Sequence, residues 1–179
     1  MSYPLYIRTC RKAIFIILLL RAAFPGERKH LRLTVYTDYA LRLLMYLALK
    51  DDQLATIAEI AKSFAISRNH LMKVAYQLGV AGYVETVRGR GGGLRLAKPA
   101  ATIGLGDVVR CTEPDMAIAS CFKPLEAPCA IRPCCVLKRA LEKAHHAFVD
   151  VLDGYTLGDL VQPRGRLVNL LGISQGARL

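Results

Sequence analysis

Four of the chain's six cysteines lie close together in one short, proline-punctuated segment. The segment reads SCFKPLEAPCAIRPCCVLKRAL over residues 120–141, and its cysteines are Cys121, Cys129, Cys134 and Cys135. Thiols gathered in this way can form disulfides, bind zinc, or hold an iron–sulfur cluster. The remaining sequence must decide among these three kinds of chemistry.

The spacing of the thiols argues against the commonest zinc sites. Zinc fingers and ribbons use pairs of cysteines separated by two to four residues. Seven residues separate Cys121 from Cys129, and four or five separate Cys129 from Cys134 or Cys135, so no second close pair completes a zinc site. Iron–sulfur clusters accept thiolates spread along a loop. The spacing therefore favours iron over zinc, and it leaves open which cysteines bind.

The distribution of charge points to a polyanionic partner. The formal net charge is +11, and 53% of the residues are hydrophobic, which is enough for a packed core. Residues 1–30 contribute +5 (six basic, one acidic), residues 31–99 another +5 (ten and five), and residues 100–179 only +1 (nine and eight). A basic first half suggests nucleic acid or an anionic membrane surface. Binding to DNA in a reducing compartment would disfavour disulfides.

Three helical patterns follow one another after residue 36. Thr37 is expected to cap the first, which closes at residues 51–52. Thr56 and Glu59 form a capping-box signature for the second, and Ser67 is expected to cap the third. The short break between the last two helices predicts a helix-turn-helix.

A basic hairpin comes directly after these helices. Residues 83–87 and 94–98 are expected to form strands around the glycine-rich turn 89–93, which makes the unit a winged helix. The N-terminal part of such a recognition helix reaches base edges, while arginines on a wing approach phosphates or the minor groove. The candidate DNA-binding residues are Ser67, Arg68, Asn69, His70, Lys73, Gln77, Arg88, Arg90 and Arg95.

The second half of the chain predicts mainly helices. A short helix is expected over residues 104–111, with Cys111 buried in it. A long amphipathic helix follows from residue 136 and stops at Gly154, and we expect it to pair with a twin subunit, with His145 and His146 facing solvent. Thr156 and Asp159 cap one further turn, and the tail after residue 161 is weakly patterned. Neither a Ser–His–Asp arrangement nor a phosphate-binding loop is present, so an enzyme is not expected.

Several separate stretches resemble one protein family. LTVYTDYALRLLMYLA, SRNHLMKVAYQLGVAGYVETVRGRGGGLRLAKPA, IGLGDVVR and YTLGDLV, together with the cysteine segment, are similar to the bacterial winged-helix Fe–S transcriptional regulators. The likeness covers about residues 31–170, and its motifs are most similar to the nitric-oxide-sensing repressors of that family. It implies a mainly α-helical fold with a small β-hairpin wing, a Cys-rich loop and a long dimerisation helix.

The resemblance also implies a cofactor and its ligands. One iron–sulfur cluster per subunit, of the 2Fe–2S or 4Fe–4S type, would be held by Cys121, Cys129 and Cys135, while Cys134 falls where the family needs no cysteine but could substitute. Some members take a fourth ligand from an aspartate of the partner subunit, and the matching position is Asp38. The alternative role of Asp38 is to stabilise the positive start of its own helix.

The function implied is that of a cytoplasmic, homodimeric repressor of nitrosative-stress genes. Its partners would be a double-stranded DNA operator and nitric oxide, the signal that lifts repression, and no membrane association is expected. The alternative within the family is a sensor of iron or of Fe–S supply. The alternative from another class is a membrane-surface or exported protein that uses residues 1–20.

The domain organisation follows from these motifs. Basic residues precede the apolar run at 13–20, which has the length of a signal-peptide core and is too short to span a bilayer. Because family members begin near the position of Leu31, residues 1–30 are expected to be an over-extended gene start, with a real extension or signal peptide as the alternative. The expected parts are 1–30 (extension), 31–99 (winged helix-turn-helix), 100–135 (connecting helix and cluster loop), 136–161 (dimerisation helix) and 162–179 (tail).

Overall fold

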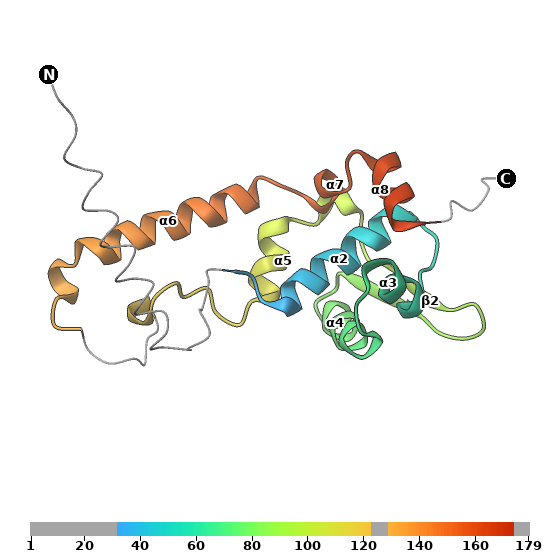
Figure 1. The fold of residues 1–179 in the computed structure, drawn as a ribbon, viewed down its shortest axis with the longest axis horizontal. Coiled ribbons are helices and arrows are strands. Elements are labelled where there is room, and N and C mark those ends of the chain that lie inside the picture. Colours follow the sequence, from blue (N-terminus) through green and yellow to red (C-terminus); the bar gives the residue numbers. More distant parts are fainter. Residues whose placement is uncertain (1–31, 123–128, 174–179) are drawn as a thin grey trace, which may run out of the picture. The chain divides into compact units, whose positions relative to one another are not determined.

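The described chain starts with three helices and a hairpin, the elements of the predicted winged helix. Further helices come after them. The computed structural model describes residues 32–122 and 129–173, so the predicted extension at 1–30 lies outside the described residues. The main elements are α2 (Val35–Lys50), α3 (Ile57–Phe64), α4 (Arg68–Val80), β1 (Val84–Val87), β2 (Gly93–Leu96), α5 (Leu105–Thr112), α6 (Val136–Asp153), α7 (Leu157–Leu160) and α8 (Arg164–Leu171) (Figure 1). The mainly α-helical fold with a small hairpin is thereby confirmed. In the part of the chain that the structure describes, no helix is both long and apolar enough to cross a membrane.

Helix α2 starts three residues earlier than predicted. Thr34, not Thr37, is its N-cap, and the Thr34 hydroxyl accepts the backbone N–H of Thr37 at 3.2 Å. Thr37 is fully buried inside the first turn. The reason lies far along the chain, because the Glu113 carboxylate accepts the N–H of Thr34 at 2.8 Å and its hydroxyl at 3.2 Å. The expectation for Thr37 was therefore wrong.

The next two helices follow the predicted local signals. The Thr56–Glu59 capping box is present, with the Thr56 N–H donating to Glu59 at 2.6 Å. Partial burial raises the pKa of Glu59, but the hydrogen bonds from Thr56 and the nearby Lys50 outweigh it and hold that pKa below its ordinary value. Ser67 does precede α4, although its side chain makes no capping hydrogen bond. The apolar face of α4 is buried, as expected, at Leu71, Val74, Ala75 and Leu78.

The turn between α3 and α4 contains a strained residue that offers a stability test. Ala65 adopts the left-handed conformation (φ 53°, ψ 41°), which costs an L-residue about 1 kcal/mol or more. Ala65→Gly should raise the free energy of unfolding by up to about 1 kcal/mol, after subtracting the greater freedom of glycine in the unfolded chain. Ala81 supplies a matched control, because it caps α4 with an ordinary φ of −77°. Urea unfolding in which Ala65→Gly destabilises as much as Ala81→Gly would contradict this account.

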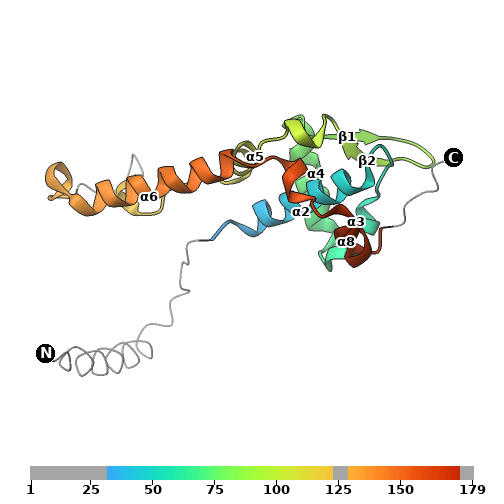
Figure 2. The ribbon, with the colours of Figure 1, turned by 90° about the horizontal axis from the view of Figure 1, so that it is seen from above.

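The wing is a two-stranded antiparallel sheet. Strands β1 and β2 pair with Glu85 opposite Arg95, and Figure 2 shows them leading into the hairpin loop. The predicted strands overlap the observed ones within one or two residues. Gly93 lets the hairpin approach the α2–α3 connection, because a side chain there would collide with the carbonyl of Ala55. Leu94 and Ala55 exchange two backbone hydrogen bonds at this point, which fixes the wing to the helical part.

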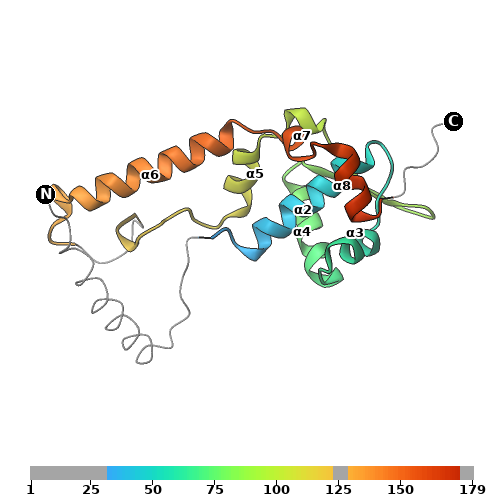
Figure 3. The same ribbon diagram turned by 45° about the horizontal axis from the view of Figure 1, so that its top comes forward.

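The tail contains a helix that the sequence did not predict. In α8, Arg164 donates to the carbonyl oxygens of Ala48 at 3.1 Å and Leu49 at 2.6 Å, and it pairs with Asp51 at 2.6 Å. These carbonyls are among the last of α2 and lack partners within that helix. Figure 3 shows α8 against this end of α2. The sequence did not predict α8, because its own pattern is weak and its partners lie more than a hundred residues away.

Helix α6 is more exposed than the other long helices. It ends at Gly154 as predicted, and the Thr156–Asp159 capping box that follows it is present, yet none of its residues is buried. Cys111, on α5, is exposed rather than buried, because Val108, Val109 and Thr112 form the inward face of that helix. His146 faces solvent as expected. His145 is half-buried, and its Nε2 atom is shielded without a hydrogen-bond partner among the described residues.

Candidate nucleic-acid interface and thiolate site

Helix α4, the predicted recognition helix, presents a polar, cationic face. Its predicted DNA-binding residues are all exposed, together with Ser67 before it: Arg68, Asn69, His70, Lys73 and Gln77. The sequence of α4 contains no carboxylate, so nothing on the helix repels phosphate. The ring of His70 lies 6.2 Å from that of Tyr39 on α2, which limits its freedom to turn toward DNA. Arg68 and Asn69 occupy the first turn, the part of such a helix that reaches base edges.

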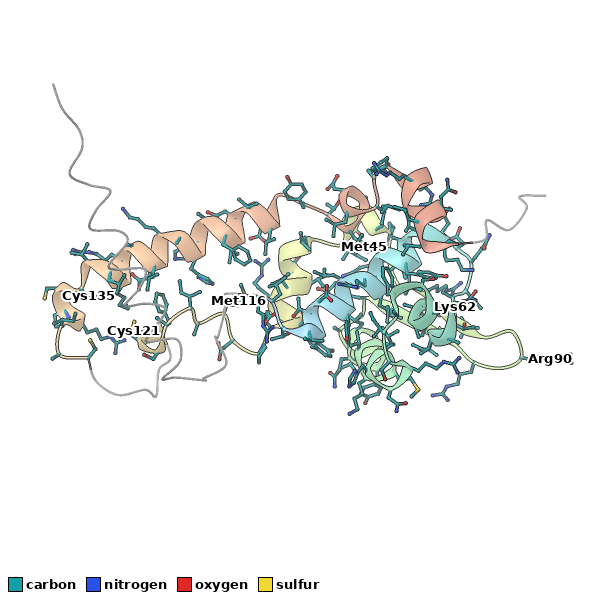
Figure 4. All side chains as sticks on the ribbon, viewed as in Figure 1. Met45, Lys62, Arg90, Met116, Cys121 and Cys135 are labelled. Carbon is teal, nitrogen blue, oxygen red and sulfur yellow. The ribbon has the colours of Figure 1, made fainter. Side chains whose placement is uncertain are left out.

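The three wing arginines are not equivalent. Arg88 and Arg90 are exposed in the turn, and Figure 4 shows Arg90 at the tip of the hairpin. Arg95 instead pairs with Glu85 across the hairpin at 3.0 Å. The hydrogen bond to Glu85, followed by the attraction of its charge, raises the pKa of Arg95. Arg95 therefore carries a partly compensated charge, and Arg88 and Arg90 are the stronger candidates for phosphate contacts.

Helix α2 contacts both the predicted recognition helix and the helix that comes before the cysteine segment. It packs against α4 on one side and α5 on the other. At its start, Thr34 donates two hydrogen bonds to Glu113, the residue that follows α5 and lies seven positions before the cysteine segment begins at residue 120. The sequence did not predict a role for Glu113, because the hydrogen bond joins residues 79 positions apart. The C-terminal end of α5, from which the chain continues toward the cysteine segment, is thus tied to the start of α2.

The four clustered cysteines lie on short, irregular elements. Cys121 belongs to η2 (Ser120–Phe122), Cys134 ends η3 (Arg132–Cys134), and Cys135 is the N-cap of α6. Cys129 and Cys134 are exposed, Cys121 and Cys135 are half-buried, and all are free thiols. Figure 4 shows Cys121 and Cys135 on the segments that lead up to α6. Among residues 32–122 and 129–173, no three His, Cys, Asp or Glu side chains come together closely enough to hold a metal ion.

The adjacent thiols Cys134 and Cys135 have different surroundings. The Cys135 sulfur accepts the backbone N–H of Lys138 at 3.3 Å, at the positive end of the 18-residue helix α6. The Cys134 thiol instead donates to the carbonyl oxygen of Ile131 at 3.6 Å. The two adjacent sulfurs are therefore not equivalent as candidate ligands, because Cys135 accepts a hydrogen bond and Cys134 donates one.

Asp38 lies in the first turn of α2 and is half-exposed. Its Oδ1 accepts the Nε–H of Arg42, one turn later, at 3.0 Å. The guanidinium of Arg42 in turn lies 5.8 Å from the ring centre of Phe64. The position suits the helix-start role, and the side chain is 45% exposed.

The junction of α5 and α6 is held by ion pairs and backbone hydrogen bonds. Arg110 contacts Asp107 at 2.7 Å and Asp153 at 2.8 Å, and the hydrogen bonds to Asp153 and Asp107 raise its pKa. Just beyond α6, the Leu105 N–H donates to the carbonyl of Tyr155 at 2.9 Å. The direction of α6 is thus set at its C-terminal end.

One side of α6 carries an exposed apolar stripe. Its members recur every three or four residues, the spacing of a coiled-coil seam: Leu137, Ala140, Ala144, Ala147 and Val151. Leu137 is 66% exposed and Val151 61%, and the neighbouring Phe148 is 44% exposed. This stripe is distinct from the half-buried face that contains Leu141, His145 and Leu152.

Comparison with known proteins agrees with this arrangement. The family model Rrf2, described as an iron-dependent transcriptional regulator, matches residues 33–163. A protein of Bacillus licheniformis named HTH-type transcriptional regulator NsrR is 49% identical over 142 residues, covering 79% of this chain and 99% of that protein. The Bacillus subtilis protein of the same name is 48% identical over 146 residues, covering 81% and 100%. Protein aau3 of Rhizobium meliloti is 47% identical over 148 residues, covering 83% and 96%.

Solved structures show the same fold. CymR, the global cysteine regulator of Bacillus subtilis, superposes with a TM-score of 0.60 at 29% identity, covering 73% of this chain and 96% of that one. T. potens IscR gives a TM-score of 0.60 at 24% identity, covering 82% and 94%, and shows the fold alone. The family resemblance expected from the motifs is confirmed. The chain belongs to the Rrf2 family of winged-helix, DNA-binding transcriptional regulators and is similar to those named NsrR.

Proposed function

We propose that the protein is a homodimeric repressor that binds operator DNA in the cytoplasm and releases it when nitric oxide reacts with a bound Fe–S cluster. The observation that carries the proposal is the link through α2. This helix packs on the proposed recognition helix α4, and its N-cap Thr34 donates hydrogen bonds to Glu113, which ends α5 seven positions before the cysteine segment. A change in that segment can therefore reach the DNA-reading surface through packed residues.

The DNA-binding surface combines base reading and phosphate contact. Arg68 and Asn69, in the first exposed turn of α4, would contact base edges in the major groove. Arg88 and Arg90, exposed on the wing, would contact phosphates or the minor groove. The remaining candidates, Ser67, His70, Lys73, Gln77 and the paired Arg95, would position the helix and wing on the duplex.

The exposed stripe on α6 supports a dimer. Large apolar side chains at Leu137 and Val151 are costly to leave in water, and the heptad-like spacing matches a seam between two helices. A two-fold dimer would present two copies of α4 to half-sites about one helical turn apart. The operator should accordingly be a two-fold symmetric sequence.

The thiolates of Cys121, Cys129 and Cys135 would hold the cluster, with Asp38 from the partner subunit as a candidate fourth ligand. When bound, the cluster would supply iron with which nitric oxide reacts. The roles of the chain's own residues follow from their contacts. The Lys138 N–H donates to the Cys135 sulfur and orients it, while Arg42 fixes the orientation of the Asp38 carboxylate.

Asn69→Ala and Arg90→Ala should affect DNA binding in different ways. Losing a base contact at Asn69 should relax sequence preference by about 1–3 kcal/mol. Losing a phosphate contact at Arg90 should weaken all sequences alike and reduce the slope of log affinity against log salt by about one unit. Fluorescence anisotropy on selected and random duplexes over a range of salt concentrations separates the two effects.

Arg139→Ala is the control for that comparison, because Arg139 is exposed on α6 and carries the same charge as Arg90. It should leave both the preference and the salt slope unchanged. Equal losses on selected and random DNA for Asn69→Ala would remove this residue from the base-reading set.

The description of the family model as iron-dependent favours a second candidate signal, the supply of iron or of clusters. The two signals are distinguished by treating the anaerobic, DNA-bound protein with a nitric-oxide donor or with an iron chelator. Release by the donor supports the nitric-oxide proposal. Release by the chelator alone supports the iron proposal.

A further inference from the structure

The outward face of α4 carries large apolar side chains that the core does not use. Met72 is 52% exposed, Tyr76 69% and Val80 71%. The apolar residues that hold α4 in place lie on the opposite side of the helix, for example Leu71 and Leu78, each at most 1% exposed. Large apolar side chains exposed in this way are costly to leave in water, and a partner that covers them gains free energy.

These side chains share a face with Asn69. Met72, Tyr76 and Val80 follow Asn69 by three, seven and eleven positions, and residues at these spacings lie above one another on an α-helix. At about 100° per residue, the four side chains fall within an arc of roughly 80°. The apolar stripe therefore continues the line of the proposed base-reading residue along the helix.

The charges around the stripe indicate which kind of partner can cover it. Arg68 and Lys73 are exposed beside it, and α4 has no carboxylate. A second copy of the same surface would be repelled by these like charges, whereas a DNA duplex is complementary to them. The apolar group that the major groove offers is the C5-methyl of thymine.

We propose that Met72 and Tyr76 read thymine methyl groups in the major groove, beside the base pair read by Asn69. The proposal rests on the proposed function, because it requires α4 to enter the groove. Val80 lies at the last position of α4, where a helix that enters the groove by its N-terminal turns has left the bases. Val80 therefore serves as the matched control, an exposed apolar residue of the same stripe outside the reading set.

The test removes single methyl groups from the DNA. An operator is first selected from a randomised duplex pool with the full chain, and each thymine is then replaced in turn by deoxyuridine, which lacks only the methyl. At one or two positions in each half-site, the affinity should fall about fourfold, the value of one buried methyl group. With Met72→Ala or Tyr76→Ala, the penalty at the corresponding position should disappear, while Val80→Ala should keep the full pattern.

The outcomes distinguish this inference from the proposed function. Specific binding that is equally strong for every deoxyuridine duplex would overturn the methyl reading and leave the repressor proposal intact. A methyl penalty that persists unchanged in both Met72→Ala and Tyr76→Ala would also overturn it. If the pool yields no preferred sequence, both proposals fail. Thermal unfolding of each variant checks that the fold is retained, which the exposure of these side chains leads us to expect.

Discussion

Cys135→Ala is expected to abolish the iron, the sulfide and the brown colour of anaerobically purified protein, whereas Cys134→Ala should retain most of all three. The Cys135 sulfur accepts the Lys138 N–H at the start of α6 and is thereby held in place as an electron-pair donor. The Cys134 thiol is engaged with the Ile131 carbonyl. Cys129→Ala should behave like Cys135→Ala. Iron and sulfide analysis with a visible spectrum measures the effect.

Cys111→Ala is the matched control, because Cys111 is an exposed thiol on α5, outside the cysteine segment. It should leave the iron content unchanged. A protein that bleaches on Cys134→Ala but stays brown on Cys135→Ala would move the ligand assignment by one residue. Stoichiometric zinc without sulfide in the unaltered protein would remove the cluster, while the DNA-binding proposal would stand.

Val151→Asp is expected to convert the dimer to a monomer and to weaken binding to a two-half-site operator by about a hundredfold or more. Two-fold symmetry introduces the charge twice into the proposed seam, where it would replace apolar surface worth about 1.5–3 kcal/mol for each side chain. The second half-site would then no longer be bound within one complex, and linkage of two sites commonly contributes a factor of 10² to 10⁴. Analytical ultracentrifugation and a DNA titration measure the two effects.

His146→Asp introduces the same charge on the exposed side of α6 that lies away from the stripe. This control should keep both the dimer and the DNA affinity. A Val151→Asp protein that still sediments as a dimer would place the subunit interface elsewhere.

The sequence predicted the structure best where residues close together along the chain satisfy one another's hydrogen bonds. The capping boxes at Thr56 and Thr156 each join residues three positions apart, and both are present. The cap of α2 was misplaced because the choice of Thr34 depends on Glu113, which is distant in sequence. Helix α8 was missed for the same reason, since Arg164 binds the carbonyl oxygens at the end of α2.

In the candidate site, too, local patterns could be predicted from the sequence and contacts that depend on the fold could not. The exposure of the α4 residues followed from helical periodicity, because the buried positions define the opposite face. The pairing of Arg95 with Glu85 depends on hairpin register, and the different hydrogen bonds of Cys134 and Cys135 depend on where α6 begins. Residue type alone could not show which arginines are free to contact phosphate, or which of the two adjacent thiols is the better candidate ligand.

The α5–α6 junction has a mechanical consequence. Helix α6 has 18 residues and is therefore about 27 Å long, so a tilt of roughly 5° at the Arg110–Asp153 end displaces the Cys135 end by about 2 Å. Gly106 brings the two helices so close that a methyl group there would collide with the Asp153 carboxylate. The contact between Arg110 and Asp153 and the thiol of Cys135 thus lie at opposite ends of α6. A small change in the angle between α5 and α6 therefore becomes a larger displacement of Cys135.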